Sequence, residues 1–285
     1  MSRTALLLLL LIPGGSTLLT AGCGSYTPLD THYNKGVEFY DQGRLEDAIR
    51  EYRMAIEDNP ENYRARYNLA VAYHDLGKKA DAAAEYDEVL KLNPDNARAR
   101  VSLASIRADE GKEAEALKLL QEAAEADRHS SFPKESLGAW YERKGDLDRA
   151  LQAYREAAAI EPKSAAAHAG VGRVLARKGA FQDAVAAYDQ AVAANGEDVA
   201  TLIAASEAHE KVGDLKKAML LQERALIFVK TRPDLWIRLA RLYEAQGRLE
   251  DAVASLWEAR GIDPKNAAVG PRLKSLYEKL SAQER

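Results

Sequence analysis

Apolar and small side chains recur along residues 29–266 with a period of 34 residues. In frames that begin at residues 29, 63, 97, 131, 165, 199 and 233, the seventh position is apolar in every frame except the first, where it is Lys35. The eighth position is always small and is occupied by Gly36, Ala70, Ala104, Gly138, Gly172, Ser206 and Ala240. A period of this length, kept in phase over seven frames, predicts one supersecondary unit stacked seven times.

Two further positions hold the same residue in every frame. The fifteenth is Gly43, Gly77, Gly111, Gly145, Gly179, Gly213 and Gly247, and the twentieth is Ala48, Ala82, Ala116, Ala150, Ala184, Ala218 and Ala252. The glycine predicts the end of a helix in a left-handed backbone conformation, which costs other residues more. Small residues at the eighth and twentieth positions are expected to let two helix backbones approach closely. Large residues at the eleventh and twenty-fourth positions, such as Tyr73 and Tyr86, fill the spaces between neighbouring helices.

Proline closes four frames, at Pro60, Pro94, Pro162 and Pro264, where a helix has to stop. With these positions aligned, the sequence resembles the tetratricopeptide repeat (TPR), in which two antiparallel helices form each unit. The resemblance implies an all-α fold, a right-handed TPR superhelix (α-solenoid) of seven helix-turn-helix repeats. These repeats span residues 29–62, 63–96, 97–130, 131–164, 165–198, 199–232 and 233–266.

The end of the repeat array has its own pattern. Residues 267–285 are expected to form a capping helix and tail, in which Leu273, Leu276, Tyr277 and Leu280 share one face of the helix. Such a helix covers the apolar end of the last repeat, as terminal caps do in solenoids. The least regular connection is Asp127–Glu135, where Pro133 is expected early in the next helix.

The first 22 residues differ in composition from the rest of the chain. Arg3 precedes an apolar run from Ala5 to Ile12, and Pro13 ends that run. A helix of eight residues rises only about 12 Å, whereas a hydrocarbon core is about 30 Å thick. Residues 1–22 therefore predict a removable signal peptide rather than a membrane span.

Leu19–Cys23 resembles the lipobox of bacterial lipoproteins, although Thr20 stands where leucine is usual. Cys23 is the only cysteine, so an internal disulfide is excluded; the alternative is a cysteine discarded with the leader. The resemblance implies that Cys23 is the lipidated N-terminus of a short tether, residues 23–28, and acyl chains would anchor it to a membrane. Gly24 in place of aspartate implies the periplasmic face of the outer membrane, with the inner membrane or the cell surface as alternatives.

Composition and motifs argue against enzymatic, metal-dependent and nucleic-acid functions. The chain is 47% hydrophobic and 29% charged with a net charge of −4, and basic residues are not concentrated as nucleic-acid binding requires. Phosphate-binding loops, dinucleotide turns, nucleophile elbows and zincin signatures are missing from the sequence. The histidines are scattered over five frames, at His32, His74, His129, His168 and His209. We therefore expect no catalytic residue, metal, cofactor or small-molecule substrate, and packing is the expected role of His32 and His168.

The family resemblance implies that the first helix of each repeat lines a concave groove through its second, fifth, sixth, ninth, twelfth and thirteenth positions. In the N-terminal part these positions are Tyr33, Asn34, Val37, Tyr40, Arg64, Tyr67, Asn68, Val71, His74, Arg98 and Ser102. Asparagine amides can pair with a peptide backbone, tyrosines offer rigid contact area and arginines bind carboxylates. This set is the predicted peptide- or protein-binding site; the alternative is the ordinary polar surface of a solenoid.

Further along, the same positions are smaller and more apolar, which would admit a partner helix. They are Ala166, Ala169, Gly170, Arg173, Ala176, Arg177, Ala200, Ile203, Ala204 and Glu207. Some members of the family hold a C-terminal carboxylate of chaperones in a five-residue clamp. Only Asn68 and Arg98 match that clamp, so chaperone-tail recognition is disfavoured.

These features favour a lipid-anchored envelope adaptor that binds proteins or peptides and assists assembly of a membrane-associated complex. TPR lipoproteins of this layout serve pilus secretins or cell-wall machinery, but no motif here selects one pathway. The alternative hypothesis is a structural TPR subunit of a polysaccharide or protein export machine. Neither hypothesis identifies the protein partner.

Overall fold

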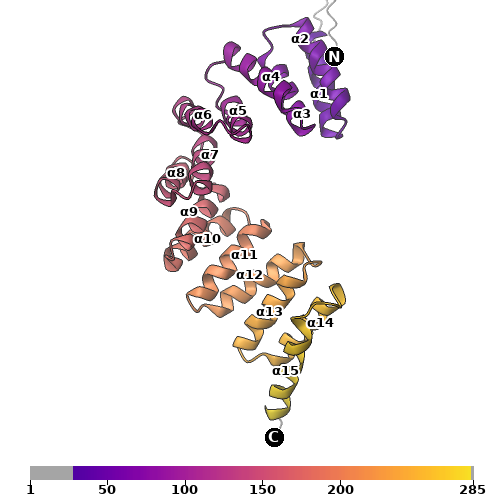
Figure 1. Cartoon of the computed structure of the whole chain (residues 1–285), viewed down its shortest axis with the longest axis vertical. Helices are drawn as coiled ribbons and strands as arrows, with labels where there is room; N and C mark the ends of the chain where they lie inside the picture. Colours follow the sequence, from indigo (N-terminus) through magenta and orange to yellow (C-terminus); the bar gives the residue numbers. More distant parts are fainter. Residues whose placement is uncertain (1–27, 284–285) are drawn as a thin grey trace, which may run out of the picture. The chain divides into compact units, whose positions relative to one another are not determined.

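The structure is a computed structural model that describes residues 28–283. Within that range every regular element is an α-helix, and fifteen helices follow one another along the chain (Figure 1). They are α1 (Pro28–Asp41), α2 (Leu45–Asp58), α3 (Tyr63–Asp75), α4 (Lys79–Leu92), α5 (Ala97–Asp109), α6 (Glu113–Ala126), α7 (Phe132–Arg143), α8 (Leu147–Ile160), α9 (Ala165–Arg177), α10 (Phe181–Ala194), α11 (Val199–Lys211), α12 (Leu215–Phe228), α13 (Pro233–Ala245), α14 (Leu249–Ile262) and α15 (Val269–Gln283).

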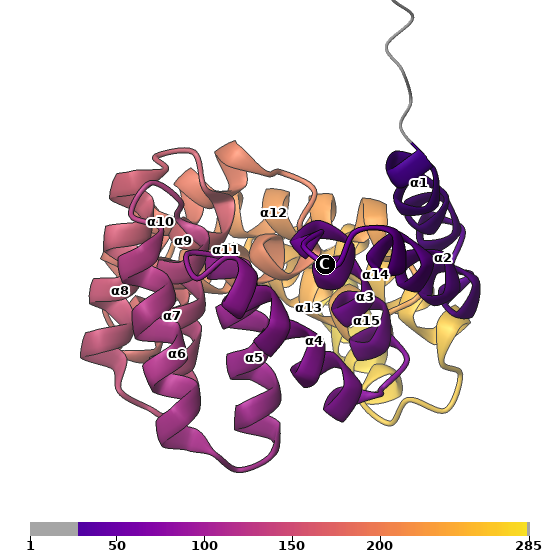
Figure 2. The same ribbon diagram turned by 90° about the horizontal axis from the view of Figure 1, so that it is seen from above.

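The helices fall into two compact units, residues 1–78 and residues 79–285. In the first unit α1 packs against α2, and α2 packs against α3. In the second unit each helix from α4 to α15 packs against the next, and its members lie side by side in sequence order (Figure 2). Contacts restricted to near neighbours are typical of solenoids. The prediction of an all-α solenoid is confirmed.

The seven glycines at the fifteenth position all adopt positive φ angles, from 74° to 86°. At the end of α1, the Gly43 amide donates to Tyr40 O at 2.9 Å and the Arg44 amide donates to Phe39 O at 2.9 Å. These bonds satisfy carbonyl groups that a helix end leaves without partners. The predicted role of the glycine as a left-handed helix terminator is confirmed.

Small residues at the eighth position make room for an aromatic ring. A Cβ atom added to Gly36 would lie 2.5 Å from the Tyr52 ring, and one added to Gly172 would lie 2.8 Å from the Tyr188 ring. Both tyrosines belong to the second helix of the same pair, and both are buried. The space at this position therefore holds a side chain, whereas the sequence led us to expect a close approach of two backbones.

The connections between helix pairs are closed by a recurrent hydrogen bond from the fourth position of the frame. Arg66 donates to Pro60 O at 3.3 Å, His168 Nε2 to Pro162 O at 2.9 Å, and Trp236 Nε1 to Lys230 O at 2.9 Å. Each acceptor lies six residues before its donor. His168 therefore has a structural role, in line with the packing role expected from the sequence.

Helix α15 packs on α14 through Val269, Leu273 and Leu276, all of which are buried. Leu280 is partly buried against the same cluster. Tyr277 lies at the edge of this face: it is 46% exposed, and its hydroxyl accepts a hydrogen bond of 3.1 Å from Trp257 Nε1 of α14. Since α15 has a neighbour on one side only, its packed face is narrower than the sequence pattern suggested.

The expected signal peptide, the lipidation site Cys23 and the tether up to residue 27 lie outside the described residues. Pro28, which we had assigned to the tether, is the first residue of α1. Within residues 28–283, no helix combines the length and apolar character that crossing a bilayer requires.

Candidate binding groove

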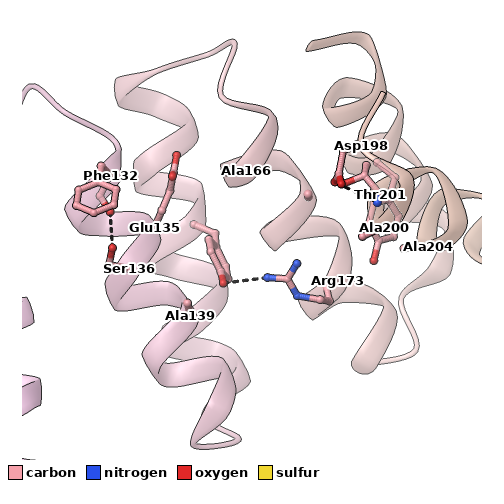
Figure 3. A pocket seen from close by; sticks show the side chains of 13 residues that line it. Phe132, Glu135, Ser136, Ala139, Ala166, Arg173, Asp198, Ala200, Thr201 and Ala204 are labelled. Carbon is pink, nitrogen blue, oxygen red and sulfur yellow. Dashed lines mark hydrogen bonds between the residues drawn. The ribbon is translucent and has the colours of Figure 1, made fainter. Parts of the chain in front are cut away.

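In the second unit, α7, α9 and α11 are the first helices of three successive pairs, and α9 contacts both α7 and α11 directly. Their shared surface contains a hollow of about 470 Å³ (Figure 3). We call it the alanine-lined hollow; it is lined by Phe132, Glu135, Ser136, Ala139, Tyr154, Ala166, Ala169, Arg173, Tyr188, Asp198, Ala200, Thr201 and Ala204. Because five of these thirteen residues are alanines and three carry aromatic rings, the hollow can receive a large apolar side chain or one face of a helix.

One mouth of the hollow carries an aromatic side chain. Phe132 at the start of α7 is 41% exposed, and Figure 3 shows it beside Ser136. The Ser136 hydroxyl donates to Phe132 O at 2.9 Å, so this serine is engaged with its own helix. An exposed ring next to small apolar walls is a suitable anchor for a partner's apolar residue.

The acidic side chains of the hollow hold its framework together. Glu135 accepts a hydrogen bond of 2.6 Å from the Ser164 hydroxyl, which links α7 to the start of α9. Asp198 caps α11 by accepting from the Thr201 amide at 3.2 Å, and it also accepts from the Thr201 hydroxyl. Ser164 and Asp198 are the N-cap residues of α9 and α11, so they fix where these helices begin. The start of each helix in turn sets where Ala166 and Ala200 face the hollow.

The floor of the hollow is a buried tyrosine ring. Tyr154 lies so close to α7 and α9 that Cβ atoms on Gly138 and Gly170 would come within 2.9 Å and 2.5 Å of its ring. Burial raises the pKa of Tyr154 to about 12, and it raises that of the neighbouring Tyr188 to about 12 as well. Both phenols therefore stay protonated at neutral pH.

An ion-pair cluster borders the floor. Arg173, labelled in Figure 3, donates two hydrogen bonds of 2.9 Å to the two oxygens of Glu142, and the Tyr154 hydroxyl lies 3.2 Å from the same carboxylate. Arg177 donates to Glu142 O at 3.1 Å. Burial of the Glu142 carboxyl opposes its ionisation, but hydrogen bonds and charge from Arg173 outweigh this and lower its pKa. The same carboxylate raises the pKa of Arg173 despite burial.

The predicted N-terminal site is divided by the structure. In the first unit, Tyr33, Asn34 and Arg64 line a hollow of about 560 Å³ with polar residues of the α2–α3 connection. Val37, Asn68 and Val71 line a smaller hollow of about 200 Å³ with Tyr40, Asp41 and Tyr52. Asn68 Nδ2 donates to the Tyr33 hydroxyl at 3.3 Å, which joins α1 to α3. One of the two asparagine amides expected to bind a peptide is thus engaged within the protein.

The remaining predicted residues lie apart from these hollows. Tyr67 and His74 are partly buried on α3, and neither lines either of the two hollows. Arg98 and Ser102 belong to α5 in the second unit, where Arg98 is exposed and Ser102 is partly buried. The eleven residues of the predicted set therefore do not form one site within a single unit.

Sequence analysis named Ala166, Ala169 and Ala200 but missed Phe132, Glu135, Ser136 and Ala139. These four occupy the second, fifth, sixth and ninth positions of the frame that starts at residue 131. The same repeat positions that predicted Ala166, Ala169 and Ala200 therefore identify these four as well. Tyr154 and Tyr188 were placed at a packing position, and they also form part of the surface of the hollow.

Two of the histidines lie beside a carboxylate. His32 Nδ1 lies 2.6 Å from Glu51, and the buried His209 lies 3.1 Å from Asp189. Across the described range, no three histidine, cysteine, aspartate or glutamate side chains gather as a metal site requires. The hollow itself presents methyl groups, aromatic rings and an arginine, which suit binding of another polypeptide.

Helix pairs stacked on one another, with a hollow along their first helices, define a repeat protein of the α-solenoid class. The chain belongs to the tetratricopeptide repeat family. One model of this repeat matches residues 33–91, 75–131, 141–199 and 172–235, and a second matches residues 233–266. This fold is typically a non-catalytic scaffold for protein–protein interaction.

Solved structures share the fold at low sequence identity. A chain of the Cut9–Hcn1 hetero-tetramer of the APC/C is 17% identical with a TM-score of 0.62; the match covers 88% of this chain and 49% of that chain. This chain thus spans about half the length of that relative. PilF of Pseudomonas aeruginosa is 15% identical with a TM-score of 0.62, covering 78% of this chain and 97% of that one.

A tetratricopeptide repeat protein from Parabacteroides merdae is 18% identical with a TM-score of 0.56, covering 87% of this chain and 98% of that one. No curated protein sequence matches this chain significantly. At these identities the solved structures show the fold alone.

Proposed function

We propose that this protein is a lipid-anchored adaptor of the bacterial envelope, which holds a segment of a partner protein and assists assembly of a membrane-associated complex. The observation that carries the proposal is the alanine-lined hollow on α7, α9 and α11, with its volume of about 470 Å³. A preformed concave surface with small apolar walls and few polar groups is the usual form of a binding site.

The partner segment is proposed to be an amphipathic helix. Ala139, Ala166 and Ala200 come from three different helices, and their small side chains let another helix approach closely. Phe132 offers an aromatic anchor at one mouth. Charged side chains in the hollow are already engaged within the protein, so an apolar face of the partner would supply most of the contact.

A photoreactive side chain at Ala166 tests this site in native membranes, and the captured protein is identified by mass spectrometry. We expect an adduct at Ala166 that disappears when Ala200→Arg fills the hollow. The matched control is a photoreactive side chain at Ala193, which is exposed on α10 and does not line the hollow. Equal capture of one protein from Ala166 and Ala193, or capture that survives Ala200→Arg, would contradict the proposal.

The membrane part of the proposal rests on the lipobox-like segment that ends at Cys23. We propose lipidation of Cys23 and a location on the periplasmic face of the outer membrane. Cys23→Ser should abolish incorporation of labelled fatty acid and release the processed protein from membranes, because acyl chains provide the anchor. Unchanged labelling of the Cys23→Ser variant would remove lipidation from the proposal.

A second candidate function is a structural subunit of a polysaccharide or protein export machine. It is favoured by Trp257 and Tyr277, which are 49% and 46% exposed on α14 and α15 and are joined by a hydrogen bond of 3.1 Å. An exposed aromatic pair of this kind is common in permanent interfaces. Co-purification with a membrane channel that depends on Trp257 and not on Ala200 would favour the structural subunit over the adaptor.

A further inference from the structure

Helix α12 exposes apolar side chains that the fold does not use. Leu220, Ile227 and Phe228 are 57%, 66% and 46% exposed. They are three of the nine large hydrophobic side chains that are exposed in the described part of the chain. None of the three lines any hollow described above. Exposure of this kind on a single helix marks an interaction surface.

The exposed residues form a stripe along α12. Leu220 and Ile227 are seven residues apart, which is about two helical turns, so they share one face. Lys216 and Arg224 lie on the same face at spacings of four residues from Leu220, and both are exposed. The opposite face is buried in the solenoid through Ala218, Leu221, Gln222, Ala225 and Leu226. We call Lys216, Leu220, Arg224, Ile227 and Phe228 the α12 stripe.

The surroundings of the stripe are strongly basic in a chain whose net charge is −4. Residues 215–232 contain five basic residues and one acidic residue, namely Lys216, Lys217, Arg224, Lys230, Arg232 and Glu223. The carboxylate of Glu223 is turned toward α13, where it accepts a hydrogen bond of 2.6 Å from Tyr243. The acidic side chain is therefore engaged inside the fold.

The basic side chains in and beside the stripe differ in how far they are engaged within the protein, and the exposed Arg224 guanidinium lies against Gly196 in the α10–α11 connection. Lys217 lies 3.6 Å from Asp189, and Arg232 pairs with Asp234 at 2.6 Å. Lys216, Arg224 and Lys230 have no ion pair within residues 28–283. Their positive charge is left to attract an anionic surface.

We propose that the α12 stripe docks on an anionic lipid surface. Protruding leucine, isoleucine and phenylalanine side chains flanked by lysine and arginine are the composition of helices that lie in a membrane interface. Apolar side chains enter the boundary of the acyl chains, and the basic side chains pair with anionic headgroups. The stripe requires no concave pocket, because a fluid lipid surface adapts to side chains that project from a helix.

This interaction is separate from lipidation of Cys23 and from binding in the alanine-lined hollow. Acyl chains would attach one end of the protein, whereas the stripe would bring α12 itself to the membrane. Lipid docking of the α12 stripe can therefore be tested independently of the proposed function.

A local probe distinguishes the stripe from the N-terminus. Because Cys23 is the only cysteine, the full chain with Cys23→Ser and Ile227→Cys can be labelled at one site with an environment-sensitive fluorophore. We expect a blue shift and a rise in emission with vesicles of phosphatidylglycerol and phosphatidylcholine, but little change with phosphatidylcholine alone. The control is the same fluorophore at Met54→Cys, which is 43% exposed on α2 and should show no shift.

Charge variants test the headgroup contribution. Each basic side chain near an anionic surface contributes roughly five-fold to partitioning, so Lys216→Gln with Arg224→Gln should weaken vesicle binding by roughly twenty-fold at low salt. Arg155→Gln with Lys163→Gln removes the same charge elsewhere in the second unit and should change binding by less than about two-fold. Circular dichroism should be unchanged in both variants.

Three results of the fluorescence experiment, and one of the charge variants, would overturn the proposal. The first is an absent shift at residue 227 with anionic vesicles, and the second is an equal shift with neutral vesicles. The third is a shift that needs no vesicles but grows with protein concentration, which would assign the stripe to contact with a second copy of the chain. Equal loss of binding in the two charge variants would also contradict a specific role for α12.

Discussion

The two units use equivalent positions of the repeat to build different surfaces. In the first unit, Tyr33, Asn34 and Arg64 give a polar hollow at the starts of α1 and α3. In the second unit, Ala166 and Ala200 occupy the second position at the starts of α9 and α11 and give an apolar hollow. Backbone geometry is shared, so the size and polarity of a few exposed side chains decide what each surface can bind.

In both units a tyrosine ring at the same repeat position lies beneath these surfaces. Tyr52 in the first unit and Tyr154 in the second occupy the twenty-fourth position, and each ring forms the floor of a hollow. Gly36 and Gly138 face these rings at the eighth position. The floor is thus a property of the fold, whereas the walls are specific to each unit.

The largest effect is expected from removing this shared floor. Tyr154→Ala deletes a ring that is 3% exposed and should lower the free energy of unfolding by about 3 to 5 kcal/mol, with a similar loss for Tyr52→Ala. Tyr154→Phe keeps the ring and should cost about 1 kcal/mol, because only hydrogen bonds to Glu142 and Arg173 are lost. Denaturant unfolding measures both, and a stable Tyr154→Ala protein would show that the floor is dispensable.

The glycine terminators provide the next test of what the units share. Gly77→Ala and Gly179→Ala place a Cβ atom on residues with φ of 74° and 78°, which should cost about 1 to 2 kcal/mol in each unit. Gly261→Ala is the control, because Gly261 lies inside α14 and a Cβ atom there meets nothing within 4 Å. That variant should gain about 0.5 to 1 kcal/mol. If thermal unfolding shows that Gly261→Ala destabilises the protein as much as the other two variants, the conformational explanation is refuted.

The contribution of the walls of each hollow can be tested by measuring partner capture. Tyr67→Ala with Asn68→Ala removes polar groups of the first unit and should weaken partner capture about five- to tenfold, or about 1 to 1.4 kcal/mol, if that surface contributes to binding. Helicity measured by circular dichroism should stay the same. Comparison with Ala200→Arg, which alters only the apolar hollow, shows which unit holds the partner. Capture that is unaffected by the double variant would leave the first unit with a structural role.

A smaller effect is expected from pH. The folded-state pKa of Glu142 is lowered below its ordinary value of 4.5, so protonation favours the unfolded chain. Its stabilising contribution is complete above pH 4.5 and is lost as the pH falls through the folded-state pKa. Glu142→Gln should flatten the loss of stability that sets in as the pH falls below about 4.5, relative to the original protein. Identical profiles for the two proteins would mean that the Arg173 pair contributes no net stability.

Much of the fold follows from counting outward from the glycines. Their spacing predicted where first helices end, and positive φ angles at all seven positions confirm it. Pro133 was expected early in its helix, and α7 has it in the first turn. These features are local, because a backbone conformation and a helix end depend on a few neighbouring residues.

Features that depend on packing between helices were harder to predict. The periodicity of residues 267–280 allowed both Leu276 and Tyr277 on the packed face. Tyr277 is nevertheless 46% exposed, because α15 packs against α14 alone. Gln222 occupies a position usually held by an aromatic residue, yet it is fully buried and donates to Leu235 O at 3.0 Å. The predicted N-terminal site also depends on packing, since Arg98 and Ser102 of α5 lie in the second unit whereas the other predicted residues lie in the first.

Contacts restricted to sequence neighbours have an evolutionary consequence. In the second unit, the interface that a helix pair offers to the next pair resembles the one that it receives from the previous pair. Duplication or loss of 34 residues would therefore lengthen or shorten the array while leaving the remaining interfaces intact. Recognition surfaces such as the alanine-lined hollow can then diversify by substitution of exposed residues, at little risk to the inherited architecture.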